Sequence, residues 1–209
     1  MKTELQHRYL QGWLGLNDRD YLLHTIAYQA APVLEQQKPG VILTFADDRR
    51  RELYGRWREE QHAIPQSEDF CHFTLQESSN HVVVLFYSPR LLRQVLQQRA
   101  SSWFLESCGY HRQPTLQTAL ADLKERYQAG CPHEIGLFLG IPLPDVLGFI
   151  RHGGKQALAD GYWKVYHDPE RKRALFAKYH EAKLGFVRQM LAGAQPSAYL
   201  RERVSPCCG

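Results

Sequence analysis

The residues best suited to chemistry stand side by side at His133 and Glu134, directly after Cys131-Pro132. An imidazole beside a carboxylate can bind a small molecule or pass a proton to and from it. Proline favours the first turn of a helix, so we expect a helix over 133–139 whose dipole stabilises the Glu134 carboxylate. A structural role stays open, in which Glu134 complements the dipole and His133 hydrogen-bonds a neighbouring carbonyl.

A second group of reactive or aromatic side chains follows at Trp163, Lys164 and Tyr166. The alternation from Tyr162 to Tyr166 predicts a short strand, in which Trp163 and Val165 share one face. The lysine between two tyrosines would then form a flat cationic surface for an aromatic or anionic ligand. In the alternative, Trp163 and Val165 belong to the core and the lysine stem runs past the tyrosine rings.

We therefore predict a ligand site where two short helices, over 133–139 and 144–152, meet this strand. Polar side chains would hold the ligand, and Phe138 and Trp163 would form its walls. An enzyme with His133 and Glu134 as acid and base would need Asp145 to converge on the same cavity. The predicted ligand-binding residues are His133, Glu134, Phe138, Asp145, Trp163, Lys164 and Tyr166.

The chain has five cysteines, an odd number, which we expect to be thiols and not a disulfide framework. Their spacing contains no CxxC pair of the zinc-binding kind, which argues against a structural zinc site. Cys207 and Cys208 are adjacent near the end of the chain and could pass a metal or electrons to a partner; chance adjacency is the alternative. Cys131-Pro132 could offer a thiolate to haem iron.

The elements that must position these residues follow from periodicity and from turn signals. They predict a helix-rich α+β single domain over 1–193, with a small, mostly antiparallel sheet of three or four strands, and a flexible tail over 194–209. Helices are expected over 21–33, 47–58, 89–99, 102–108, 115–128, 133–139 and 144–152, and from 168 onward; strands are expected over 41–45, 71–76, 81–87 and 162–166.

Composition narrows the class of protein further. Hydrophobic residues make up 44% and charged residues 23% of the 209 residues, as in ordinary globular domains. No apolar run approaches the length of a membrane span, and the first residues are too polar for a signal peptide, so we expect a cytoplasmic protein without a membrane partner. The net charge of +4 is weaker than dedicated nucleic-acid domains show.

The two short helices, read alone, are similar to a helix-turn-helix with a glycine at the turn. The outward positions of the second helix would be Leu143, Pro144, Asp145, Leu147 and Gly148. None of these side chains reads a base edge in the bidentate manner of arginine or asparagine, and a carboxylate repels phosphate. Nucleic acid is therefore an unfavoured partner.

The string PHEIGLFLGIPLPDVLGFI, followed by GYWKVYHD, resembles the signature of a bacterial family of unknown function that is common in anaerobes. The resemblance extends through AAPVLEQQKPGVILTF and FLESCGY, and covers most of residues 25–190. Members of that family often carry His-Cys where this chain has Gln29-Ala30, so a metal role of that pair does not carry over. Family genes near flavodoxins and iron or haem uptake systems add haem or iron to the candidate ligands.

These observations favour an accessory protein that binds a small molecule or cofactor, whose identity the sequence leaves unknown. Two alternatives stay open. The first is an enzyme that uses His133 and Glu134 on a small metabolite. The second is a protein-interaction module without a ligand, with a redox or other protein partner.

Overall fold

The computed structural model describes residues 4–204 and shows a helix-rich α+β fold around a three-stranded sheet. The helices are α1 (Glu4–Gln11), η1 (Gly12–Gly15), α2 (Asp18–Leu34), α3 (Leu53–Glu60), η2 (Gln61–Ala63), α4 (Pro89–Leu96), α5 (Arg99–Ser107), α6 (Leu116–Tyr127), α7 (Ile135–Phe138), α8 (Leu143–His152), α9 (Pro169–Leu191) and α10 (Pro196–Arg203). The strands are β1 (Gly40–Ala46), β2 (Cys71–Glu77), β3 (His81–Tyr87), β4 (Ala159–Asp160) and β5 (Lys164–Val165).

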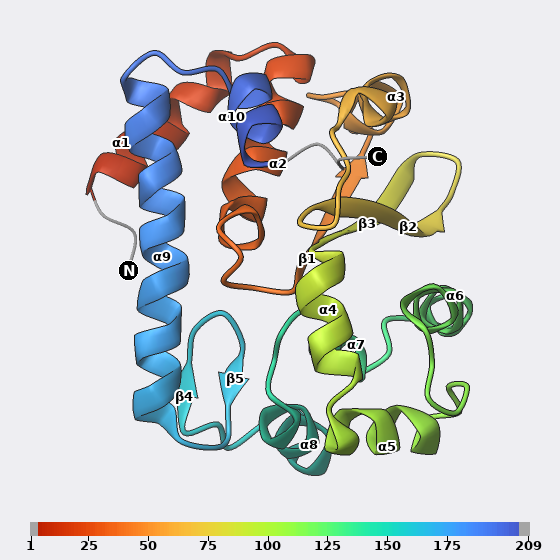
Figure 1. Cartoon of the computed structure of the whole chain (residues 1–209). Helices are drawn as coiled ribbons and strands as arrows, with labels where there is room; N and C mark the ends of the chain where they lie inside the picture. The colour runs from red at the N-terminus through yellow and green to blue at the C-terminus, as the bar shows by residue number, and fades with distance from the viewer. Residues whose placement is uncertain (1–3, 205–209) are drawn as a thin grey trace.

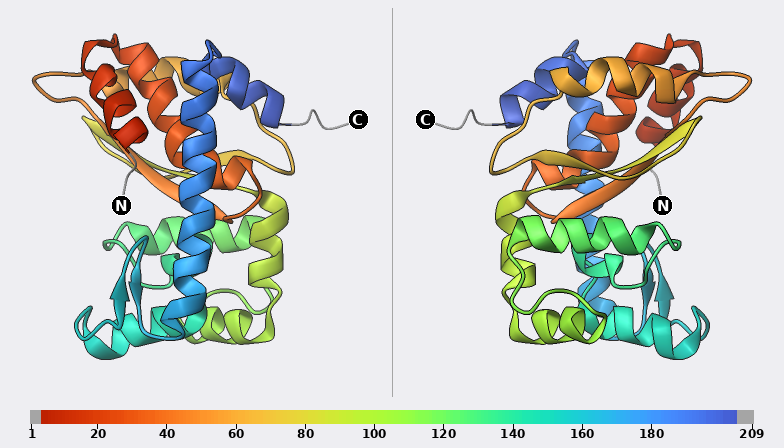
Figure 2. Two further views of the ribbon diagram at one scale, coloured as in Figure 1. Left: turned by 90° about the vertical axis from the view of Figure 1, so that its left-hand side faces the viewer. Right: turned by 90° about the vertical axis from the view of Figure 1, so that its right-hand side faces the viewer.

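The sheet has the order β1-β3-β2, and both pairings are antiparallel. The central strand β3 is apolar on both faces because each face meets a different core. Val82, Val84 and Phe86 face a cluster with α2, α3 and the end of α9, whereas Val83, Leu85 and Tyr87 face a cluster with α4, α6 and α7. Figure 2 shows the sheet as the layer between these two halves of the molecule.

The long helix α9 joins the two halves, as its full-length course in Figure 1 shows. Asp168 starts it by accepting a hydrogen bond from the Arg171 amide (3.3 Å), and Pro169 occupies the first turn. Its first half packs Tyr179 against the β4–β5 hairpin, and its second half packs Phe186 in the core with α2. Although α9 has 23 residues, no helix within residues 4–204 is long and apolar enough to cross a lipid bilayer.

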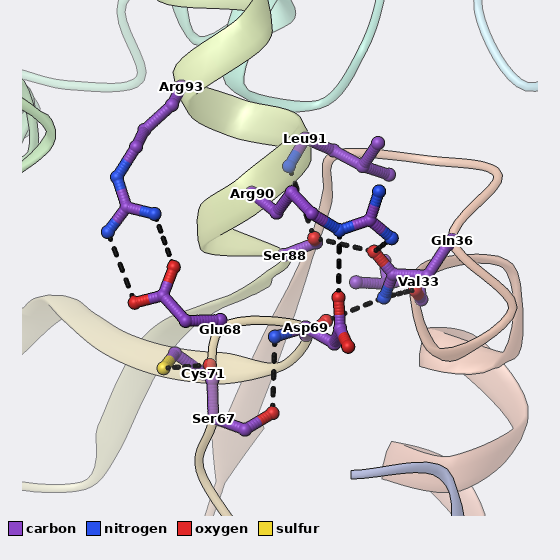
Figure 3. Close-up of polar contacts among 10 residues, drawn as sticks. All are labelled: Val33, Gln36, Ser67, Glu68, Asp69, Cys71, Ser88, Arg90, Leu91 and Arg93. Carbon is purple, nitrogen blue, oxygen red and sulfur yellow. Dashed lines mark hydrogen bonds and ion pairs between the residues drawn. The ribbon is translucent and has the colours of Figure 1, made fainter. Parts of the chain in front are cut away.

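A polar network fastens the end of α2 to the start of α4 (Figure 3). The Gln36 amide donates to the carbonyls of Val33 (3.0 Å) and Asp69 (2.8 Å). Its oxygen accepts from the Ser88 hydroxyl (2.8 Å) and from Arg90 (3.0 Å). The Arg90 guanidinium also donates to the Asp69 carboxylate (3.0 Å). These hydrogen bonds therefore hold together three segments that are far apart in sequence, at this end of the sheet.

The helix predicted from residue 47 begins later, at Leu53. Asp47 and Asp48 do not enter it, because their carboxylates accept backbone N–H groups instead. Asp48 accepts from the amides of residues 50 and 51, which closes a turn, and Asp47 accepts from the Tyr54 amide at 2.8 Å. Asp47 thus accepts hydrogen bonds from backbone N–H groups at the start of α3, although it lies outside that helix.

Up to residue 204 the structure also differs from the prediction of a flexible tail over 194–209, whose last five residues, 205–209, lie outside the described part of the chain. Residues 196–203 form α10, in which Tyr199 and Leu200 are buried. The Tyr199 ring meets the Phe186 ring edge-on, with centroids 5.0 Å apart, and the Arg203 guanidinium pairs with Glu35. Buried apolar side chains thus dock a segment whose composition is otherwise polar.

Candidate functional site

A cavity of about 370 Å³ lies between the α7–α8 pair and the β4–β5 hairpin, which are neighbours in Figure 1. Its interior is lined mainly by apolar side chains, and two polar side chains belong to its exposed rim. The interior residues are Ile135, Ile141, Val146, Phe149 and Trp163; the rim residues are His133 and Lys164. A cavity of this size and polarity suits a small, mainly apolar molecule.

Two glycines explain why the segment before α8 can fold so tightly. A Cβ at Gly136 would lie 2.8 Å from a methyl group of Val146. Gly140 has a positive φ of 73°, and a Cβ there would lie 2.4 Å from the Pro39 ring. These glycines let α7 pack against α8 and against the loop that leads into β1.

The predicted helix over 133–139 is shorter than expected, since α7 spans residues Ile135–Phe138 alone. A turn precedes it, with hydrogen bonds from Gly136 N to His133 O (3.1 Å) and from Leu137 N to Glu134 O (3.0 Å). Four residues sum to a small dipole, so the dipole does not hold Glu134. Its carboxylate, 4% exposed, instead accepts a charge-assisted hydrogen bond from the Arg126 guanidinium of α6.

Asp145 is a buried residue whose hydrogen bonds connect α8 to the strand region that follows it. One carboxylate oxygen accepts the amides of Tyr166 (2.8 Å) and His167 (2.9 Å), and the other accepts the Trp163 indole N–H (2.9 Å). The Lys172 ammonium lies 3.9 Å from the second oxygen. The expectation that Asp145 faces outward on the second helix is therefore wrong, because these four donors draw it into the interior.

The acid–base arrangement of His133, Glu134 and Asp145 is not formed. His133 is exposed at the cavity rim, where its ring meets the Phe149 ring edge-on at 5.5 Å. Glu134 is turned toward Arg126 and does not line the cavity. Asp145 borders the cavity, but its oxygens are already engaged.

The remaining predicted residues divide between the cavity and the surrounding core. Trp163 is buried and lines the cavity, with its ring 4.6 Å from that of Phe176, and Lys164 stands at the rim, 3.8 Å from Asp160. Phe138 is fully buried in the core under the sheet. The Tyr166 ring stacks on His152 (5.6 Å) outside the cavity. The cavity thus unites His133, Asp145, Trp163 and Lys164, and leaves Glu134, Phe138 and Tyr166 elsewhere.

The sequence prediction missed the residues that form most of the cavity interior, above all Val146 and Phe149. Their spacing of three places both on one face of α8. That spacing is equally typical of a helix face packed in the core, so it could not single out a cavity.

Within residues 4–204, no three His, Cys, Asp or Glu side chains gather as a metal ion requires. Cys108 and Cys131 are free thiols, and Cys131 borders the cavity. The metal site predicted at Cys207 and Cys208 lies outside the described residues.

Fold and cavity together define a helix-rich α+β domain with an apolar pocket beside a small hairpin. Residues 26–199 match the family described as "Protein of unknown function (DUF3793)". The match covers most of the chain, so the protein belongs to this family, and the predicted membership of an uncharacterised family is confirmed. Neither the curated proteins nor the solved structures contain a match to this chain.

Proposed function

We propose that this protein binds a small, mainly apolar molecule in the cavity between α7–α8 and the β4–β5 hairpin, and acts as an accessory protein. The observation that carries the proposal is the composition of the cavity. Its interior is apolar, while His133 and Lys164 place an imidazole and an ammonium group at the rim. The apolar interior would shield a ring of the ligand from water, and the imidazole and ammonium groups at the rim would orient an acidic substituent of that ligand.

Catalysis is the weaker candidate, because the acid–base trio predicted from sequence lacks the mutual hydrogen bonds that proton transfer needs. Haem or iron stays a prediction of the family resemblance. His133, or the Cys131 thiol close by in sequence, would be the residue at this cavity that holds the iron. Haem titration of the wild type should then give a Soret shift that His133→Ala abolishes if the imidazole is the donor. A protein-interaction module without a ligand stays the other alternative.

The first test fills the cavity with a larger side chain on one of its walls. Leu139 lines it, so we expect Leu139→Trp to weaken binding of 1-naphthoate at least about tenfold in isothermal titration calorimetry. Leu147→Trp is the matched control, because Leu147 is 43% exposed on the outer side of α8. Equal affinities of the two variants, both with wild-type melting temperatures, would contradict the proposed site.

The rim is tested by changing the ligand together with the protein. Lys164 is 46% exposed, so its ion pair with a ligand carboxylate contributes less than about 1 kcal/mol. Lys164→Met should weaken 1-naphthoate about threefold and leave the uncharged 1-naphthalenemethanol unchanged. A uniform loss for both compounds would show that Lys164 supports the cavity wall and does not read charge.

A further inference from the structure

A cavity of about 640 Å³, the α5 cavity, lies between the exposed face of α5 and the segment that leads into α6, two helices that are neighbours in Figure 1. Four side chains of α5 line it, at positions that share one face of the helix: Arg99, Ser102, Trp103 and Glu106. Arg112 lines it from the segment before α6. These residues differ from those of the cavity between α7–α8 and the β4–β5 hairpin.

The tryptophan of this cavity is the exposed one of the chain. Trp103 is 70% exposed, whereas Trp13, Trp57 and Trp163 are buried. Within residues 4–204 no aromatic ring and no cation stacks on the Trp103 indole. A flat ring of a ligand could therefore stack on it and remove both surfaces from water.

The cavity also has positive charge that no acid balances by an ion pair. Within the described residues no carboxylate pairs with Arg99 or Arg112, whereas Arg90 and Arg93 of the preceding helix both pair with acids of the loop before β2 (Figure 3). Arg99 stands in the first turn of α5, which has no acidic residue and no side-chain cap. Since the helix dipole is positive at this end, an anion there would be stabilised by the guanidinium and by the dipole together.

Glu106 is the acid that lines the cavity, about two helical turns from Arg99. One of its oxygens accepts the Gln113 amide (3.2 Å) and the Ser102 hydroxyl (3.4 Å). The other oxygen accepts no hydrogen bond from residues 4–204, so a ligand could donate to it. With a rise of about 1.5 Å per residue, Trp103 lies about 6 Å and Glu106 about 10 Å from Arg99 along the helix axis. The face of α5 thus presents a cation, a ring and an acceptor in this order.

We propose that the α5 cavity binds a mononucleotide whose base carries an amino group, such as adenosine monophosphate (AMP). The phosphate lies at Arg99 and the start of α5, the base stacks on Trp103, and the amino group of the base donates to Glu106. Arg112 adds positive charge from the other wall. One sugar separates phosphate from base, which suits two side chains about one helical turn apart.

A single nucleotide fits this cavity better than a nucleic-acid strand does. The net charge of the chain is only +4, and the Glu106 carboxylate at the far end of the cavity would repel the next phosphate of a strand.

Tryptophan fluorescence reports on this site directly, because acrylamide reaches the exposed Trp103 more easily than the three buried tryptophans. Saturating AMP should lower the acrylamide quenching constant at least about twofold, since the base covers the indole. Uridine monophosphate, whose base lacks the amino group, should bind more weakly. Trp103→Phe should show weak quenching with and without AMP. Quenching of the wild type that millimolar AMP leaves unchanged would overturn the proposal.

Calorimetry separates the phosphate from the base. Arg99→Met should weaken AMP about tenfold and leave adenosine, which lacks the phosphate, unchanged. Trp103→Ala should weaken both compounds, and Trp103→Phe should recover much of the affinity because a ring is restored. Arg50→Met is the matched control, since Arg50 is exposed on the loop before α3, and it should affect neither compound.

Two outcomes of the same titrations would contradict the mononucleotide site. The first is equal affinity of AMP for the wild type and Arg99→Met; the second is tighter binding of oligoadenylate than of AMP, which would make a strand the ligand. Leu139→Trp should bind AMP as the wild type does, so the result is independent of ligand binding between α7–α8 and the hairpin.

Discussion

At the scale of single residues, the carboxylate of Asp145 contributes more to this architecture than His133 or Glu134 does. It is 1% exposed and is contacted by two backbone amides and an indole N–H of residues 163–167 and by the Lys172 ammonium of α9. A buried carboxylate with this many donors fixes the hairpin against α8. The wall of the apolar cavity that contains Trp163 therefore depends on Asp145.

Asp145→Asn should lower the free energy of unfolding by about 3 kcal/mol, measured by urea denaturation. The new amide can keep one acceptor for the backbone N–H groups, but its NH₂ group would face the Trp163 N–H and the Lys172 ammonium. Asp160→Asn is the matched control, because Asp160 is 76% exposed and its loss should cost less than about 1 kcal/mol. Similar costs for both variants would remove Asp145 from this role.

At the scale of elements, contact between α8 and the strand region depends on a glycine within a helix. A Cβ at Gly148 would lie 2.4 Å from Cβ of Tyr166, an atom that cannot turn away. Glycine normally weakens a helix interior relative to alanine, so its presence here is explained by close packing.

Gly148→Ala should therefore destabilise the protein by about 2 kcal/mol, even though alanine favours helices. Gly185 of α9 offers the contrast, because a Cβ there would meet nothing within 4 Å. Gly185→Ala should raise the free energy of unfolding by about 0.5–1 kcal/mol. Urea midpoints of the two variants that shift in the same direction would contradict this account of the packing.

The sequence predicted most elements of the fold, because apolar periodicity and turn residues are local signals. The hairpin of β2 and β3 and the helix that begins at Pro169 followed from such signals. The candidate site could be predicted less well from the sequence. Glu134 lies in the turn before α7, and Arg126 lies in α6 eight residues earlier, so their pairing depends on how these two segments pack. The contact of the Lys38 ammonium with the rings of Tyr162 and Tyr179 likewise joins residues more than a hundred positions apart.

At the scale of the whole molecule, α9 fixes the β4–β5 hairpin relative to the main core. One half of this helix packs against α2 and the other half against the hairpin, as the left view of Figure 2 shows. The hairpin in turn borders the proposed ligand cavity through Trp163 and a second cavity through Tyr162. The proposed ligand site therefore depends on the position of residues 159–165, the β4–β5 hairpin, which α9 holds in place.

The most direct test of the central claim is native mass spectrometry of the gently purified protein, with identification of any small molecule released from it. The account predicts an apolar molecule, bound one to one, in the wild type and in Leu147→Trp, and its loss from Leu139→Trp, whose indole fills the first cavity. The same bound mass in all three proteins, or in none of them, would contradict it.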